Sequence, residues 1–189
     1  MTAILTVMVF TLVGCSSDVF SKKLICSNLY SPYCANLEFI FSDGQNNTSG
    51  KASIIKNDTV SVSFTEPEAF SGITIKSDPY GNADVFSFEF SGIPASIPKT
   101  VTSELSLLFS LFSDEIPSKI SSLEKDAFKI SEISSESAGE MIEVFFVENN
   151  MSYNIIYDKE SGIPHSIDAG NDELSVHVEL SDFKPSASE

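Results

Sequence analysis

Positive charge is the scarcest property of this sequence. Only 11 of the 189 residues are Lys or Arg, against 27 Asp and Glu, which gives a formal net charge of −16. Binding to nucleic acid requires a basic patch that neutralises phosphates, so a nucleic-acid partner is disfavoured. The same acidic excess favours a solvated surface that keeps a protein soluble and away from anionic lipid headgroups.

Residues typical of catalytic and metal sites are also few. There are two histidines: His177 lies on the polar side of an alternating segment, and His165 lies at the exit of a hairpin. Neither has a Cys, Asp or His at the spacing of metal ligands, and no glycine-rich phosphate loop is present. The acidic residues within 168–173 are interpreted as a solvated turn rather than a Ca²⁺ site. We therefore predict no catalytic residue, metal or cofactor, and keep a hydrolase only as a distant alternative.

The first 14 residues contain no charge, and residues 2–14 are almost entirely apolar. This run is shorter than the roughly 20 residues that cross a bilayer, so it fits a cleaved export signal. Residues 12–15, Leu-Val-Gly-Cys, resemble the lipobox of bacterial lipoproteins. That resemblance implies that Cys15 carries a diacylglyceryl group, becomes the mature N-terminus and anchors the protein on the extracytoplasmic face of the cell membrane. The alternative is a buried N-terminal helix or strand.

Cysteine is rare as well, with three residues in the chain. If Cys15 is lipidated, Cys26 and Cys34 remain as a candidate pair in a compartment that permits disulfides. Two buried thiols are an equally good interpretation, because spacing alone does not fix the geometry of a bridge.

Most of the chain from residue 37 onward shows alternation of apolar and polar residues, which is typical of strands with one wet face. Turn residues such as Asp, Asn, Gly and Pro separate the alternating segments. The predicted strands cover residues 37–41, 50–55, 60–65, 72–76, 86–91, 128–133, 141–147, 152–157 and 174–181. Short strands at regular spacing predict a large curved antiparallel sheet or open barrel rather than βαβ units.

Helical spacing of apolar residues is confined to one strong segment, residues 99–112, which follows Pro98. Pro117 is expected to stop this helix soon after residue 116. A second, weaker helix is predicted over residues 19–29. A helix that is apolar around most of its circumference needs a partner, and the concave face of a curved sheet provides one.

The predicted fold class is therefore α+β, mainly antiparallel β, with about eight or nine strands and one or two helices over the concave face. The length suits one domain. We expect a signal peptide over residues 1–14, a lipidated tether over residues 15–24 and a single β-rich domain over residues 25–185.

This layout resembles bacterial proteins with the LolA/LolB-like fold, which are half-open β-barrels with helices over the concave face. The resemblance spans residues 34–183 and is carried by Pro-Glu-Ala-Phe-Ser-Gly at residues 67–72 and by Tyr-Asp-Lys-Glu-Ser-Gly-Ile-Pro at residues 157–164. Small lipoproteins of Gram-positive bacteria look similar. The resemblance implies an apolar cavity that carries lipid or a lipidated protein.

Two functional hypotheses follow from this pattern. The first is a monomeric, membrane-anchored lipoprotein that binds or carries a lipid or other apolar ligand without catalysis. The second is a cell-surface interaction module with a filled core and an acidic docking face. Seven side chains could either line a cavity or fill the core. They are Phe86, Phe88, Phe90, Leu105, Leu108, Phe109 and Phe112.

Overall fold

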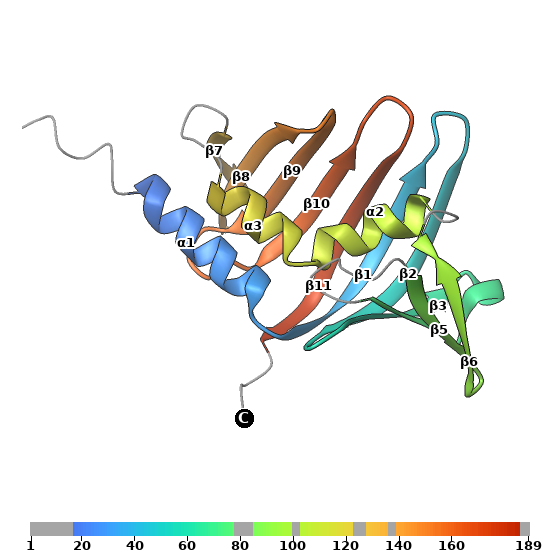
Figure 1. Cartoon of the computed structure of the whole chain (residues 1–189). Coiled ribbons are helices and arrows are strands. Elements are labelled where there is room, and N and C mark those ends of the chain that lie inside the picture. The colour runs from blue at the N-terminus through green and yellow to red at the C-terminus, as the bar shows by residue number, and fades with distance from the viewer. Residues whose placement is uncertain (1–16, 78–84, 100–102, 123–127, 136–138, 186–189) are drawn as a thin grey trace, which may run out of the picture.

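The computed structural model describes residues 17–77, 85–99, 103–122, 128–135 and 139–185. The described strands form one antiparallel sheet of eleven strands (Figure 1). They are β1 (Tyr33–Ser42), β2 (Asn47–Lys56), β3 (Val60–Glu66), β4 (Ile73–Ser77), β5 (Val85–Phe90), β6 (Ile93–Pro98), β7 (Phe128–Ser135), β8 (Gly139–Glu148), β9 (Met151–Asp158), β10 (Pro164–Gly170) and β11 (Ser175–Pro185).

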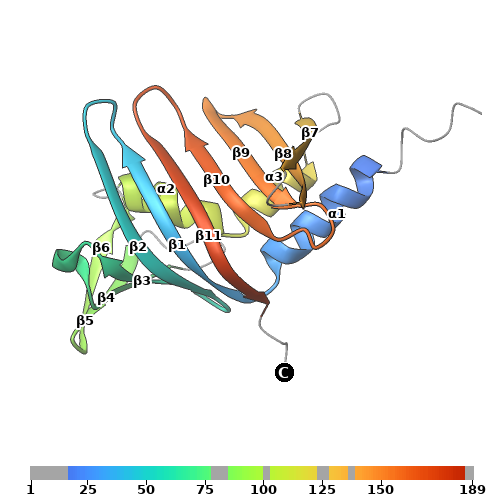
Figure 2. The same ribbon diagram turned by 180° about the vertical axis from the view of Figure 1, so that it is seen from behind.

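The order of the strands across the sheet is β6-β5-β4-β3-β2-β1-β11-β10-β9-β8-β7. The chain thus starts in the middle of the sheet and runs outward to one edge. It then crosses to the opposite edge and returns strand by strand until β11 pairs with β1. The crossing segment carries the helices α2 (Ser103–Phe112) and α3 (Glu115–Ser122), which lie over the concave face (Figure 1). The convex face carries no described helix, as Figure 2 shows from behind.

Side-chain alternation sets which residues face the helices. In β1, the side chains of Leu37, Phe39 and Phe41 are buried on the concave side, while Glu38 and Ile40 between them are exposed. This is the period-two pattern of a sheet that buries one face. The predicted fold class, a mainly antiparallel curved sheet with helices over its concave face, is confirmed by the strand order and the position of the helices.

The predicted number of strands is too low, because β6 and β10 were missed. Strand β6 contains Pro94 and Pro98, and a proline argues against a strand assignment since it cannot donate to the ladder. The structure tolerates both prolines because β6 is an edge strand that pairs only with β5. Strand β10 begins with Pro164 and ends with Gly170, so its sequence reads as turn rather than strand.

The predicted helices are both present. Helix α1 (Ser17–Tyr30) includes the expected residues 19–29 and begins inside the segment predicted as a tether. Helix α2 (Ser103–Phe112) covers only residues 103–112 of the segment predicted over 99–112, because Pro98, expected to precede the helix, is the last residue of β6, and residues 100–102 lie outside the described ranges. A short 3-10 helix η1 (Glu68–Phe70) follows β3. None of the helices in the described ranges has the length and hydropathy needed to cross a membrane.

Helix α3 (Glu115–Ser122) was not predicted, although the end of the preceding helix before Pro117 was. The structure uses Pro117 in the first turn of the new helix. A proline is accepted there because the first backbone N–H groups of a helix have no intrahelical partner. The proline therefore marks the junction between two helices rather than the end of helical structure.

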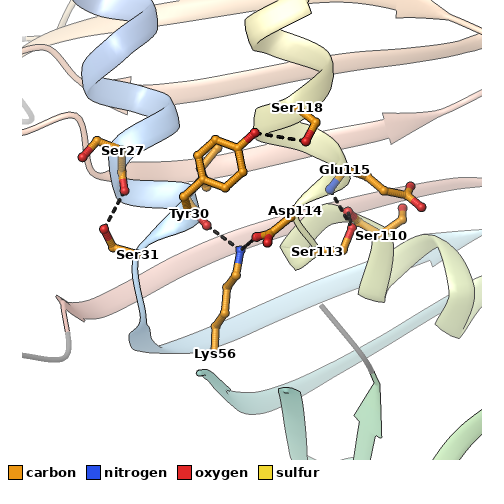
Figure 3. A network of polar contacts seen from close by, with 10 residues as sticks. Ser27, Tyr30, Ser31, Lys56, Ser110, Ser113, Asp114, Glu115 and Ser118 are labelled. Atoms are coloured by element: carbon orange, nitrogen blue, oxygen red, sulfur yellow. Dashed lines mark hydrogen bonds and ion pairs between the residues drawn. The ribbon is translucent and has the colours of Figure 1, made fainter. Parts of the chain in front are cut away.

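A buried ion pair links α1 and the turn between α2 and α3 to the sheet (Figure 3). The Nζ atom of Lys56, at the end of β2, lies 2.7 Å from Oδ1 of Asp114 and also donates to the carbonyl oxygen of Leu29 in α1. The Lys56 side chain is 3% exposed and the Asp114 side chain 21% exposed. Burial lowers the pKa of Lys56, and the neighbouring carboxylate of Asp114 opposes that effect. One ammonium group thus joins three elements that are distant in sequence.

Candidate functional site

The candidate site is a cavity of about 340 Å³ at one end of the concave face. It lies between the first turn of α2 and the half of the sheet formed by β1 to β6. Under the rest of α2 the space is filled, because Leu108, Leu111 and Phe112 are at most 1% exposed. The helix therefore covers a solid core at its C-terminal end and an open space at its N-terminal end.

The walls of the cavity are almost entirely apolar. Each of the strands β1, β3, β4, β5 and β6 contributes at least one apolar side chain, and η1 and α2 supply the others. These side chains are Phe39, Phe41, Phe64, Phe70, Ile73, Ile75, Phe88, Ile97 and Leu105, together with Pro67. Most of the wall residues on β1, β3 and β4 are buried, whereas Phe70 is 49% exposed at the edge. The site is thus a pocket with an apolar interior that opens to solvent.

A glycine in β2 permits the position of one wall residue. Gly50 pairs with Phe39 across the two strands. A Cβ atom on Gly50 would lie 2.5 Å from Cζ of Phe39 and 2.6 Å from the carbonyl oxygen of Glu66. The absence of a side chain therefore lets the Phe39 ring lie across β2, where it packs edge-on against Phe64 with ring centroids 5.8 Å apart.

Four polar residues complete the lining: Asp43, Asn46, Thr48 and Glu104. The first three come from the β1–β2 hairpin, and Glu104 comes from the first turn of α2. The carboxylate of Asp43 accepts hydrogen bonds from the backbone N–H groups of Asn46 and Gln45, at 2.7 Å and 2.9 Å. These donors, that of Asn46 first, lower the pKa of Asp43, so it is ionised at neutral pH. The polar part of the lining therefore carries two acids and no base.

The structure separates the seven side chains predicted to line a cavity or fill the core. Phe88 and Leu105 lie on the wall of the cavity. The side chains of Leu108, Phe109 and Phe112 are buried in the core beneath α2. Phe86 is also fully buried, with its ring centroid 4.9 Å from that of Phe109. Phe90 lies beyond the helix at the end of β5 and is 46% exposed.

Most wall residues were missing from that prediction because it relied on the α2 segment and on β5. The alternation in β1 places Phe39 and Phe41 on the same face as Leu37, and the same pattern applies to Phe64 in β3. These alternations indicate which side chains face inward. They do not indicate which inward residues the helix leaves uncovered, since that depends on where α2 crosses the sheet.

The two cysteines in the described part of the chain are not joined. Both are thiols, and Sγ of Cys26 lies 3.5 Å from the carbonyl oxygen of Pro117 in α3. Cys34 lies between the buried residues Tyr33 and Ala35 of β1, so its side chain points to the convex face. Helix α1 lies on the other side of the sheet, which prevents the bridge. Cys15 lies outside the described residues.

Neither histidine lines the cavity. His177 on β11 lies opposite Asp168 on β10, with Nδ1 and Oδ1 2.6 Å apart. Burial lowers the pKa of His177, but the hydrogen bond and charge of Asp168 outweigh it, so the pKa is raised above its ordinary value. His165 is exposed near the start of β10. Among the described residues, no three His, Cys, Asp or Glu side chains gather as a metal site would require.

No protein-family model matches the chain, and no curated protein matches it in sequence. Similar folds occur among solved structures. An uncharacterized conserved protein from Thermus thermophilus is 9% identical, with 92% of this chain and 90% of that chain covered and a TM-score of 0.55. MucB is 10% identical with a TM-score of 0.50, and the match covers 93% of this chain but 61% of MucB.

A LolA superfamily protein from Nitrosomonas europaea is 8% identical, with 92% of this chain and 95% of that chain covered. Its TM-score is 0.47, and a match at that level carries no conclusion for this chain. At such low identities, the likeness to these proteins concerns the fold alone.

Proposed function

We propose that this protein is an extracytoplasmic lipoprotein that binds or carries a lipid or another apolar ligand, without catalysis. The cavity under the N-terminal end of α2 is the observation that carries the proposal. Its volume of about 340 Å³ lies within the range of roughly 300–1,000 Å³ that is typical of small-ligand sites.

The chemistry of the cavity wall supports noncovalent binding. An alkyl chain that enters such a pocket leaves water, which is worth about 0.8 kcal/mol for each buried CH₂ group. The polar groups of the lining come from the β1–β2 hairpin and the first turn of α2, so they can orient the polar end of a ligand. A mainly apolar site with a few polar groups suits an amphiphile.

The resemblance of residues 12–15 to a lipobox supports an acyl anchor at Cys15. Two acyl chains give a stable anchor, whereas one would be marginal. Helix α1 begins at Ser17, so a lipid on Cys15 would hold the domain close to the membrane. Anchoring would hold the protein at a membrane surface, which is a source of amphiphiles, and the monomer is sufficient because one chain forms the whole pocket.

Native mass spectrometry and a binding assay test the proposal. The full chain with Cys15→Ser, which cannot be lipidated, should carry an apolar adduct after gentle purification and should enhance the emission of a neutral naphthylamine dye. Leu105→Trp fills the mouth of the cavity and should weaken dye binding about tenfold or more. Val147→Trp is the matched control, because Val147 is 56% exposed on β8, away from the cavity.

The same measurements can refute the proposal. A clean protein mass together with no dye binding would contradict it. Equal dye affinity in Leu105→Trp and the parent chain would show that the dye binds elsewhere. The interaction module would then be the better explanation, and its partners, recovered by crosslinking, should be lost at high salt.

A further inference from the structure

The distribution of charge around the cavity points to the chemistry of the ligand's polar end. Asp43 and Glu104 are the charged residues that line the cavity. Their carboxylates belong to two different elements, the β1–β2 hairpin and α2. A ligand whose apolar part enters the cavity can place its polar end beside either of them.

None of the described lysines lines the cavity. Lys51 and Lys76 lie on the neighbouring strands, but each alternates with residues of the concave face and so points to the convex face. Lys51 pairs with Glu38 at 3.2 Å, and Lys76 pairs with Glu89 at 3.8 Å. Lys99 lies over the ring of Phe86, 5.5 Å from its centroid.

The segments of sequence that adjoin these elements add no positive charge. The chain contains no arginine, and residues 78–84 and 100–102, which flank β4, β5 and α2, contain no lysine. The net charge of −16 adds a negative potential over the whole molecule, which attracts cations and repels anions. Local and global charge therefore favour the same kind of ligand.

We propose that the cavity selects amphiphiles with a cationic head, such as a protonated amine on a short alkyl chain, over amphiphiles with a carboxylate. This inference rests on the proposed function, since it assumes that the cavity binds an apolar chain. The volume of about 340 Å³, near the lower end of small-ligand sites, suits a single chain such as decyl rather than a lipid with two long chains.

Three probes that share the same ten-carbon skeleton test the proposal: decylamine, decanol and decanoate. Each competes with the neutral dye for binding to the full-length protein carrying Cys15→Ser. At neutral pH the amine is a cation and the acid an anion. Decylamine should bind about tenfold more tightly than decanoate, with decanol between them, because exposed carboxylates give modest interactions. The difference should shrink between about 0.1 M and about 1 M salt, where screening becomes nearly complete.

Glu104→Gln should reduce the preference for the amine about threefold and leave the affinity for decanol unchanged, since it removes a charge but keeps the size of the side chain. Glu160→Gln changes the net charge equally but lies in the exposed turn after β9, on the other half of the sheet. It should leave the preference unchanged. The comparison separates a local effect of Glu104 from the charge of the whole molecule.

The outcomes distinguish the two proposals. If decanol and the dye bind but decanoate binds as tightly as decylamine, the cavity function stands and the inference about the head is wrong. The inference is also overturned if Glu104→Gln and Glu160→Gln reduce the preference for the amine equally, because the effect is then due to the charge of the whole molecule. If none of the three probes displaces the dye, the proposed binding function fails as well.

Discussion

Removal of the Asp114 carboxylate should destabilise this protein more than removal of the lysine that it pairs with. In Asp114→Ala, the ammonium of Lys56 stays in a position that is 3% exposed, with the carbonyl oxygen of Leu29 as its remaining contact. An uncompensated buried charge costs about 3–5 kcal/mol. We expect about 3 kcal/mol, because Leu29 still accepts a hydrogen bond and the space left by Asp114 is reached by water.

Lys56→Met removes the charge but keeps most of the apolar stem. The carboxylate of Asp114 is 21% exposed and can be hydrated, so the main loss is the donor to Leu29. An unsatisfied buried carbonyl costs about 1–3 kcal/mol, and we expect a value near the lower end. The double variant Lys56→Met/Asp114→Ala should therefore be more stable than Asp114→Ala alone.

Urea unfolding followed by circular dichroism at neutral pH measures these differences in the full chain with Cys15→Ser. The slope of the free energy against urea should stay constant if only stability changes. A smaller loss for Asp114→Ala than for Lys56→Met would refute the reasoning, because it would mean that Lys56 is hydrated in the folded protein. Strong dependence of either loss on salt would contradict burial in the same way.

Three further predictions concern a wall residue, a pH dependence and the anchor. Gly50→Ala should lower the free energy of unfolding, measured with urea, by about 1–3 kcal/mol and should weaken dye binding, because its Cβ would push the Phe39 ring aside. Unchanged stability and dye affinity would contradict the close approach of Phe39 to Gly50. The raised pKa of His177 beside Asp168 contributes stability that is fully present below pH 6.5 and is lost as pH rises through the folded-state pKa. In urea unfolding, the difference in the free energy of unfolding between the parent chain and His177→Gln should therefore decrease above neutral pH. The decrease should be less than about 1 kcal/mol because the side chain is 39% exposed. An increase in this difference with pH would contradict the prediction. Cys15→Ala should leave the membrane fraction after cell fractionation, and retention there would refute lipid anchoring at this residue.

The positions of most strands and of two helices could be predicted because they depend on local patterns. Phe39 and Phe41 alternate with polar or exposed neighbours, and Leu105, Leu108 and Phe112 recur at helical spacing. Where the local pattern was misleading, tertiary context decided. Pro94 is accepted in a strand only because β6 has one free edge, and Pro117 is accepted in a helix only because it falls in the first turn.

The mainly antiparallel fold class and the inward faces of the strands follow from local residue patterns, and the shortage of positive charge follows from composition. Long-range packing, in contrast, makes α2 fill the concave face beneath Leu108 and Phe112 and leave a cavity beside Leu105. That result depends on the strand order, on the missing side chain at Gly50 and on the path of the helices between opposite edges of the sheet. The two acids line one cavity for the same reason, because the hairpin that holds Asp43 and the helix that holds Glu104 are distant in the sequence and border the same cavity only in the folded protein.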